Sequence, residues 1–502
     1  MKNIILIFLL YSAFIFSQDI NVPIDTIVKT SHETSIKGKK IKYTAETGMQ
    51  PVWDNDGKPI ASLFYTYYKR SLPNDSKVKE SHRPIIISFN GGPGSGSLWM
   101  HIGYTGPRVL KIDDEGFPIQ PYGMKTNPYS IIDTADIVFV CPVNTGYSRM
   151  LPNKKGNYPD RKKFFGINAD IKYLATWINT FITRKNRWES PKYIIGESYG
   201  GTRVMGLSYE LQSSHWMYLN GVIMVSPADY KLLEFEDGQE DAIDSSLHLP
   251  YYAATAWYHK MLDKEIQSMD LLAFLPQVEE FTINKLIPAI AKGGFISNNE
   301  RDEIAEKYSY YSGLDKDFIL DYNLDIPNYA FWKELLRKSD GLTIGRLDSR
   351  YRGIDKTNAG SSPDTNIELN SWNHSFTPAI NYYIRNELKF ETDIKYNVFG
   401  PVHPWDREND NTRKNLRKAM AQNPFLKVFI QSGYYDGATN YFQAKYTMWQ
   451  VDPSGKMKDR FYFEGYRSGH MMYLRAEDLK KSNDDLREFI KNSSTNGMPA
   501  KY

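Results

Sequence analysis

The sequence predicts an α/β protein in which a mostly parallel central sheet is flanked by helices and interrupted by a large helical insertion. Short runs rich in Ile, Val, Tyr and Phe each end in glycine or polar residues, which is typical of buried strands that lead into loops. An amphipathic helical pattern separates two of these runs, as expected where helices pack on a parallel sheet. The stretch from about 230 to 400 is instead rich in aromatic residues and helical patterns such as "LLAFLPQVEEFTINKLIPAI".

The strand-like runs follow one another along the chain. The first four are "RPIIISFNGGPG", "ADIVFVCPVNTG", "PKYIIGESYGG" and "LNGVIMVSPAD". Between the second and third, apolar side chains recur at helical spacing at Ile167, Ile171, Leu174, Trp177 and Ile178. The strand pattern resumes at "FLKVFIQSGYYDG" and "RFYFEGYRSGHMMY". We therefore expect one core built from residues 18–229 and 401–502, with a helical cap inserted at 230–400.

The N-terminus, "MKNIILIFLLYSAFIFSQ", joins a basic start at Lys2 to an apolar run and then to the small residue Ser17. This pattern predicts a secretory signal peptide, residues 1–17, and its apolar run is short for a membrane span. An uncleaved anchor is the alternative. We expect a secreted or periplasmic protein with no membrane association after cleavage. The single cysteine, Cys141, means that such a chain folds without an internal disulfide.

Composition excludes some classes of protein. A hydrophobic share of 41% with 24% charged residues excludes a disordered chain. The 62 Lys and Arg residues nearly balance the 59 Asp and Glu residues, and no polybasic block stands out. No nucleic-acid partner is therefore expected. Nothing in the sequence indicates an oligomeric state.

Ser198 lies in "GESYGG", at the carboxyl end of the third predicted strand, where parallel sheets carry their reactive sites. A single G-x-S-x-G is weak evidence, because it also fits a turn with a solvated hydroxyl. A nucleophilic serine needs a base, and the base needs a carboxylate to orient it. Asp436 and His470 each follow a later strand, in the order Ser, Asp, His of α/β-hydrolase sheets. The sequence therefore predicts a triad of Ser198, Asp436 and His470.

Other residues fit these roles less well. Of the nine histidines, His470 alone combines a position well after the serine with a loop at a strand end. Asp229 also follows a predicted strand and is the alternative orienting carboxylate.

An acyl-transfer site also needs donors for the oxyanion. One is the backbone N–H after the nucleophile, at Tyr199, and another comes from a loop after an earlier strand, here "NGGPGSGS". That loop lacks the G-K-[ST] ending of a phosphate-binding loop, which argues against a nucleotide. Neither H-E-x-x-H nor a pair of thiols occurs, so no metal or other cofactor is expected.

Five motifs, "NGGPG", "PVNTGYS", "GESYGG", "SGYYDG" and "SGHMMY", together resemble the serine carboxypeptidase family, and the pattern is that of an exported bacterial-type member. The resemblance runs through nearly all of the mature chain and implies an α/β-hydrolase fold with a helical cap. It implies that Ser198, Asp436 and His470 are the catalytic triad. It also implies that the backbones of Gly92 and Tyr199 form the oxyanion hole.

The resemblance further implies how a peptide is recognised. The family's site for the substrate's terminal carboxylate falls on Asn90, Gly91 and Glu197. The methionine after the catalytic histidine, which lines the pocket for the leaving residue, corresponds to Met471.

The chain departs from the family in three places. Ser95 stands where a disulfide-bonded cysteine is usual. Tyr104 stands where relatives have a glutamate that partners the carboxylate-binding glutamate. "PVNTGYS" carries Asn144 for a glycine and follows Val140 in place of an aspartate. The last two changes concern the pH profile and the substrate pocket rather than the class of reaction.

These observations predict a serine carboxypeptidase that releases C-terminal residues from peptides through an acyl-enzyme. Its partners are peptides with a free C-terminus. An acyltransferase or esterase with the same triad is the alternative, because the covalent intermediate is shared. A catalytically inactive binding protein that uses the cap cleft is a third reading, against which the intact triad argues.

Overall fold

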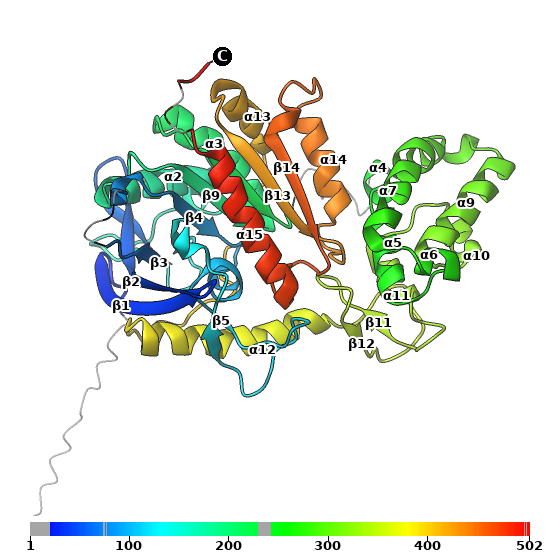
Figure 1. Cartoon of the computed structure of the whole chain (residues 1–502), viewed down its shortest axis with the longest axis horizontal. Helices are drawn as coiled ribbons and strands as arrows, with labels where there is room; N and C mark the ends of the chain where they lie inside the picture. The colour runs from blue at the N-terminus through cyan, green and yellow to red at the C-terminus, as the bar shows by residue number, and fades with distance from the viewer. Residues whose placement is uncertain are drawn as a thin grey trace, which may run out of the picture.

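A ten-stranded sheet runs through the computed structural model of the chain (Figure 1). The structure describes residues 21–73, 76, 78–228, 242–495, 497 and 499–501. The predicted signal peptide and Asp229 lie outside the described residues. The parallel part of the sheet consists, in spatial order, of β7 (Asp136–Val140), β4 (Ile85–Phe89), β9 (Lys192–Glu197), β10 (Gly221–Val225), β13 (Lys427–Gly433) and β14 (Phe461–Tyr466).

Antiparallel strands from the N-terminal part of the chain widen this sheet. The long strand β3 (Pro59–Arg70) pairs with β7 on one side and with β2 (Lys39–Trp53) on the other, and β1 (Thr26–Ile36) forms the edge. The short β8 (Arg149–Met150) also pairs with β3. The six predicted strand-like runs do not include these strands. The structure therefore adds an antiparallel part to the predicted parallel sheet.

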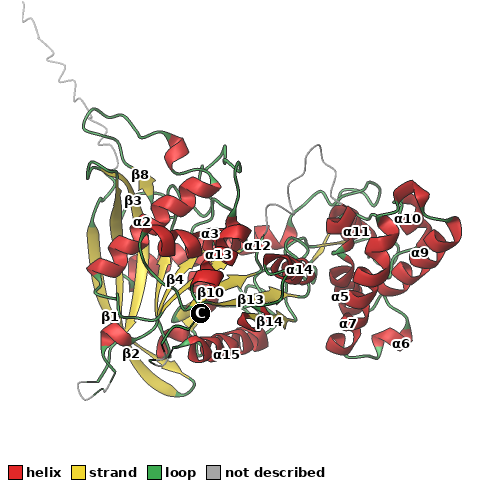
Figure 2. Ribbon diagram, turned by 90° about the horizontal axis from the view of Figure 1, so that it is seen from above, coloured by secondary structure: helices red, strands yellow, loops and turns green. Residues whose placement is uncertain are grey.

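The central strands are buried on both faces, as their unbroken apolar sequences require. In β4, Ile86 packs into one hydrophobic core while Ile85 and Ile87 pack into the other. Figure 2 shows α15 on the opposite side of the sheet from α2, α3 and α13. The face opposite α15 is covered by α2 (Ile167–Arg184), α3 (Tyr199–Ser214), α13 (Thr412–Gln422) and α14 (Tyr441–Val451). The other face holds α1 (Leu98–Met100), the π-helix η2 (His101–Thr105), α12 (Ile367–Tyr382) and α15 (Ala476–Ser493).

A helical lobe stands beside the carboxyl-terminal half of the sheet, at the right of Figure 1. It has its own hydrophobic core, to which Tyr435 and Tyr441 of the sheet domain also contribute. Its helices are α4 (Ala242–Ser246), α5 (Leu249–Tyr258), α6 (Lys264–Gln267), α7 (Leu271–Phe281), α8 (Ile287–Ile290), α9 (Asn298–Ser312), α10 (Lys316–Asp321) and α11 (Asn328–Glu334). α12, although it follows in sequence, packs on the sheet instead. The exact domain limits stay a prediction.

Two small antiparallel ribbons lie outside the main sheet, β5 (Arg108–Leu110) with β6 (Met124–Thr126) and β11 (Thr343–Ile344) with β12 (Arg352–Gly353). The loop between β11 and β12 reaches the edge of the sheet where the predicted site lies. Its Arg346 carbonyl accepts a hydrogen bond of 3.0 Å from the Gly437 N–H, and its Leu347 carbonyl accepts one of 2.6 Å from the His470 N–H. The lobe is thereby tied to the loops that carry Asp436 and His470.

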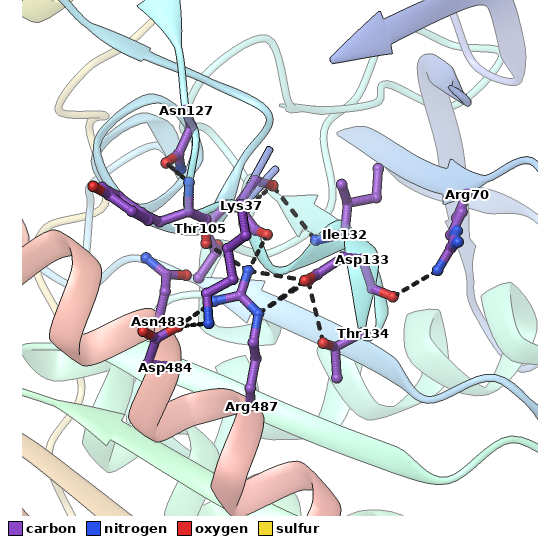
Figure 3. A network of polar contacts seen from close by, with 12 residues as sticks. Lys37, Arg70, Thr105, Asn127, Ile132, Asp133, Thr134, Asn483, Asp484 and Arg487 are labelled. Carbon is purple, nitrogen blue, oxygen red and sulfur yellow. Dashed lines mark hydrogen bonds and ion pairs between the residues drawn. The ribbon is translucent and has the colours of Figure 1, made fainter. Parts of the chain in front are cut away.

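The C-terminal helix α15 is fastened to the N-terminal hairpin by charged groups (Figure 3). Asp484 forms an ion pair of 2.5 Å with Lys37 in the turn between β1 and β2. Arg487 lies 3.0 Å from Asp133 and also donates to the Ser130 carbonyl at 2.6 Å, which ties the helix to the segment before β7.

None of the helices in the described part of the chain has the length and apolar character needed to cross a bilayer.

Candidate active site

Ser198 occupies a sharp turn between β9 and α3. Its backbone has φ 59° and ψ −125°, a conformation that costs energy for a residue with a side chain and is typical of nucleophile turns. The surrounding sheet holds it there, because the Ser198 N–H donates to the Val225 carbonyl at 2.9 Å. The glycines of "GESYGG" are needed for close packing, since a Cβ on Gly201 would lie 2.6 Å from Cβ of Pro227. Ser198 is partly exposed while Glu197 and Tyr199 are buried.

Asp436 and His470 meet at the ends of β13 and β14. The Asp436 carboxylate is fully buried, and its Oδ2 lies 2.7 Å from His470 Nδ1. Its other oxygen, Oδ1, accepts the backbone N–H groups of Ala438 at 2.9 Å and Thr439 at 3.1 Å. Because an ionised carboxylate can only accept, His470 carries its proton on Nδ1, and Nε2 of the neutral ring is left as a base.

The pKa of His470 is set by opposing effects. Burial by itself lowers it, but the charge and hydrogen bond of Asp436, with the charge of Glu197, outweigh burial and raise the pKa above its ordinary value. Glu197 raises it only while ionised. A neutral Glu197 therefore makes it easier for His470 to be neutral and act as a base.

Ser226, directly after β10, joins the loops of the site. Its hydroxyl donates to the His470 carbonyl at 2.8 Å, and its own carbonyl accepts from the Thr439 hydroxyl at 2.9 Å. The preceding residue, Val225, accepts the Ser198 N–H. Residues 225–226 thus form hydrogen bonds to all three loops that carry the predicted triad and fix their positions relative to one another. Among the described residues no hydrogen bond joins the Ser198 hydroxyl to His470, a contact that often tightens only when substrate binds.

The predicted oxyanion loop packs directly on the nucleophile turn, because β4 is the neighbour of β9 in the sheet. A Cβ on Gly91 would lie 2.5 Å from the Tyr199 backbone nitrogen and 2.6 Å from the Glu197 carbonyl, so only glycine fits. Gly92 has φ 107°, in the region that favours glycine. The loop that carries Gly92 therefore lies against the backbone of Tyr199, and the role of these two N–H groups as oxyanion donors stays a prediction.

A buried ion pair supports this loop from below and was not evident from sequence. Arg203 Nε on α3 lies 2.6 Å from Asp170 Oδ2 on α2, and both residues are fully buried. The same guanidinium donates to the Asn90 carbonyl and, at 3.4 Å, to the Pro93 carbonyl. The spacing of these residues gives no signal in the sequence, because the contacts depend on how two helices pack.

The buried carboxyl group of Glu197 lies beside the nucleophile. Its Oε2 accepts a hydrogen bond from the Asn90 side-chain amide, and its Oε1 accepts one of 2.6 Å from the Tyr473 hydroxyl. Burial raises the pKa of Glu197 to about 7. The sequence did not identify Tyr473 as a partner, although "SGHMMY" contains it. The carboxyl group thus keeps its proton up to near neutrality.

Tyr104 stands where the family has a glutamate that partners Glu197, but its hydroxyl does not contact Glu197. Its hydroxyl donates to Gln431 Oε1 at 2.8 Å, and its ring stacks on Tyr473 with centroids 4.9 Å apart. Met471, predicted to line the pocket for the leaving residue, is buried next to His470, and its role stays a prediction. In the ranges that the structure describes, no group of three or more His, Cys, Asp or Glu side chains is placed to hold a metal ion.

The chain matches the family model described as "Serine carboxypeptidase" over residues 38–463. Curated relatives include serine carboxypeptidase-like 36 of Arabidopsis thaliana, 26% identical over 34% of this chain, and the vitellogenic carboxypeptidase of Aedes aegypti, 27% identical over 32%. The matched segments span only 33% and 30% of the length of these two proteins.

A solved structure shows the same fold. The prohormone-processing carboxypeptidase of Saccharomyces cerevisiae aligns over 91% of this chain and 92% of its own, with a TM-score of 0.51 and 14% sequence identity. This similarity, with the parallel sheet and its flanking helices, confirms the predicted α/β-hydrolase fold. With the family model matching most of its length, the chain belongs to the serine carboxypeptidase family.

Proposed function

We propose that this protein is a secreted or periplasmic serine carboxypeptidase that removes C-terminal residues from peptides. The observation that carries the proposal is the buried Asp436–His470 contact of 2.7 Å at the end of the same sheet as Ser198, with the carboxyl group of Glu197 beside it. Two of the similar proteins, those of Aedes aegypti and Saccharomyces cerevisiae, are named as carboxypeptidases. Export rests on the N-terminal pattern of residues 1–17, which resembles a signal peptide.

Ser198 attacks the carbonyl carbon of the last peptide bond while His470 Nε2 takes its proton. Asp436 holds the His470 ring and stabilises its charged form. The N–H groups of Gly92 and Tyr199 donate to the oxygen that becomes negative. His470 then gives the proton to the leaving amine, and water releases the acyl group by the same steps in reverse order.

Glu197, Asn90 and Gly91 bind the terminal carboxylate of the peptide in this proposal. A charged Glu197 would repel that carboxylate, whereas a neutral one donates a hydrogen bond to it. An amide has two N–H donors, and Asn90 gives only one of them to Glu197, so the other can reach the peptide. Met471 lines the pocket for the departing residue.

The test is to incubate the purified protein with matched peptides that have free or amidated C-termini and to identify the products by mass. We expect single residues to be lost from the free-acid peptides, and no loss in Ser198→Ala, for which kcat falls about a millionfold. Internal cleavage, or equal turnover of both peptides by a route that survives Ser198→Ala, would contradict the proposal. Adding an alcohol and looking for ester products measures how much the site acts as an acyltransferase.

A further inference from the structure

The Tyr473 phenol contacts the carboxyl group that we assign to substrate recognition. Its hydroxyl donates to Glu197 Oε1 at 2.6 Å, and Tyr473 is fully buried. Tyr473 follows His470 by three positions, so the loop after β14 supplies both the base and this phenol. A change at Tyr473 can therefore alter recognition without touching the groups that react.

The second oxygen of the same carboxyl group also faces a donor. The backbone N–H of Met100 donates to Asn90 Oδ1 at 3.1 Å, and because a backbone N–H can only donate, the Asn90 oxygen must face Met100. The Asn90 NH₂ group is thereby turned toward Glu197 Oε2. Both oxygens of Glu197 thus accept a side-chain hydrogen bond, an arrangement that favours the ionised carboxylate.

The position of Tyr473 is fixed by its neighbours. Its ring lies nearly parallel to that of Tyr104, at an interplanar angle of 8°. The stacked rings keep the phenol against Glu197, a contact that Tyr104→Phe would retain. The Tyr104 hydroxyl itself donates to Gln431 on β13, so Tyr104 offers a second buried hydroxyl nearby that does not touch the carboxyl group.

A small number of neighbouring groups set the pKa of Glu197. Burial, followed by repulsion from Asp436, raises its pKa, while the charge of His470 and the hydrogen bonds from Tyr473 and Asn90 lower it. The pKa of Tyr473 is itself raised well above its usual value by burial, so the phenol remains a donor. Three groups lower the pKa of Glu197, and one of them, His470, must be neutral when it acts as a base. Tyr473 and Asn90 are then left to stabilise the ionised form of Glu197.

We propose that Tyr473 is a positioning residue that sets the highest pH at which this protein binds the terminal carboxylate of a peptide. It does so because its hydroxyl stabilises ionised Glu197. The inference rests on the proposed carboxypeptidase function. A terminal carboxylate binds well only to neutral Glu197, since two like charges in a buried site repel each other. Removal of the hydroxyl keeps Glu197 neutral to higher pH and extends peptide binding in the same direction.

The experiment compares the full chain with Tyr473→Phe and Tyr104→Phe, using a blocked dipeptide and its methyl ester. KM and kcat are measured from about pH 5 to about pH 9. For Tyr473→Phe, we expect the midpoint at which the dipeptide's KM rises to move up by about one pH unit, because a hydrogen bond to the charged form is lost. The ester's KM should stay unchanged across this pH range, because the ester has no terminal carboxylate, and Tyr104→Phe should behave like wild type.

An unchanged midpoint in Tyr473→Phe, with both substrates still hydrolysed, would overturn the inference and leave the proposed function standing. An equal shift in Tyr104→Phe would overturn it as well. A wild-type protein that hydrolyses the ester but not the dipeptide would contradict the proposed function, and the inference with it. The infrared band of the protonated carboxyl group, identified by its loss in Glu197→Gln, gives a readout independent of turnover and should persist to higher pH in Tyr473→Phe.

Discussion

The hydroxyl of Ser226 donates a hydrogen bond of 2.8 Å to the backbone carbonyl of His470. Ser226 has φ 43°, and its backbone N–H donates to the Gln431 carbonyl at 2.7 Å, so the residue is locked between β10 and β13. His470 is thus held through its backbone by Ser226 and through its ring by Asp436. The structure gives this serine a part in the site even though it touches none of the reacting atoms.

We expect Ser226→Ala to lower kcat about tenfold with little change in KM, since one hydrogen bond of about 1 kcal/mol that positions His470 is lost. Steady-state kinetics on a free-acid peptide measures this. Ser208→Ala is the matched control, because the Ser208 hydroxyl is also buried and donates to a carbonyl, that of Met205, within α3. A kcat loss of the same size in Ser208→Ala would mean that the effect is general destabilisation.

Replacing Asp436 by Asn should lower kcat by about four orders of magnitude, because the amide allows the His470 ring to adopt the wrong tautomer. Asp436 Oδ2 lies 2.7 Å from His470 Nδ1, closer than the Thr439 hydroxyl at 3.1 Å. Activity is measured on a reactive ester, where slow turnover can still be detected. Asp229→Asn is made in parallel. A comparable loss in that variant, with Asp436→Asn only mildly affected, would transfer the orienting role to Asp229.

Arg203→Leu should reduce the free energy of unfolding by about 3–5 kcal/mol, because Asp170 would then be a buried carboxylate without a positive partner, held by the Tyr173 hydroxyl alone among the described side chains. Urea unfolding followed by circular dichroism measures the change. Combining it with Asp170→Leu should recover part of the loss, since the uncompensated charge is removed. If the double variant is less stable by the full sum of the two single changes, the ion pair does not account for the effect.

The sequence carries strong signals where backbone geometry restricts the residue. Ser198, Gly91 and Gly92 lie in turns where space or φ limits the choice of side chain, and these turns follow runs of buried β-branched residues. Such runs and turns made the parallel sheet predictable, together with the loops at its carboxyl edge that carry Ser198, Asp436 and His470. The paired loops after β13 and β14 followed from the same logic.

Contacts between distant segments had no such signal. Tyr473 reaches Glu197 across 276 positions of sequence, and Arg203 supports a loop 113 positions away. Nothing local restricts these side chains, because their partners are set by how sheet and helices pack. The N-terminal strands were missed for a related reason: β2 and β3 alternate less clearly, since much of each strand is buried on both faces.

Glu197→Gln should make the KM of free-acid peptides nearly independent of pH. In the wild-type protein, burial raises the pKa of Glu197 to about 7, so the neutral form that we propose to bind a terminal carboxylate is lost as the pH rises through that value. His470 sets the opposite limb, because it must lose its proton as the pH rises before it can act as a base. The wild-type profile of kcat/KM should therefore be bell-shaped.

Glutamine has no ionisable proton and still carries an N–H donor, so in Glu197→Gln the alkaline limb should flatten while the acid limb remains. Profiles of kcat/KM for a free-acid peptide and for its ester, taken side by side, measure this. The ester has no terminal carboxylate, so its KM should be the same in both proteins, while any movement of its acid limb should be to lower pH, because Glu197 no longer raises the pKa of His470. Glu46→Gln is the control, since Glu46 is also buried but bonds to Tyr65, far from the triad in the sheet order. Equal effects of Glu197→Gln on peptide and ester would show that Glu197 supports the turn and does not recognise the substrate.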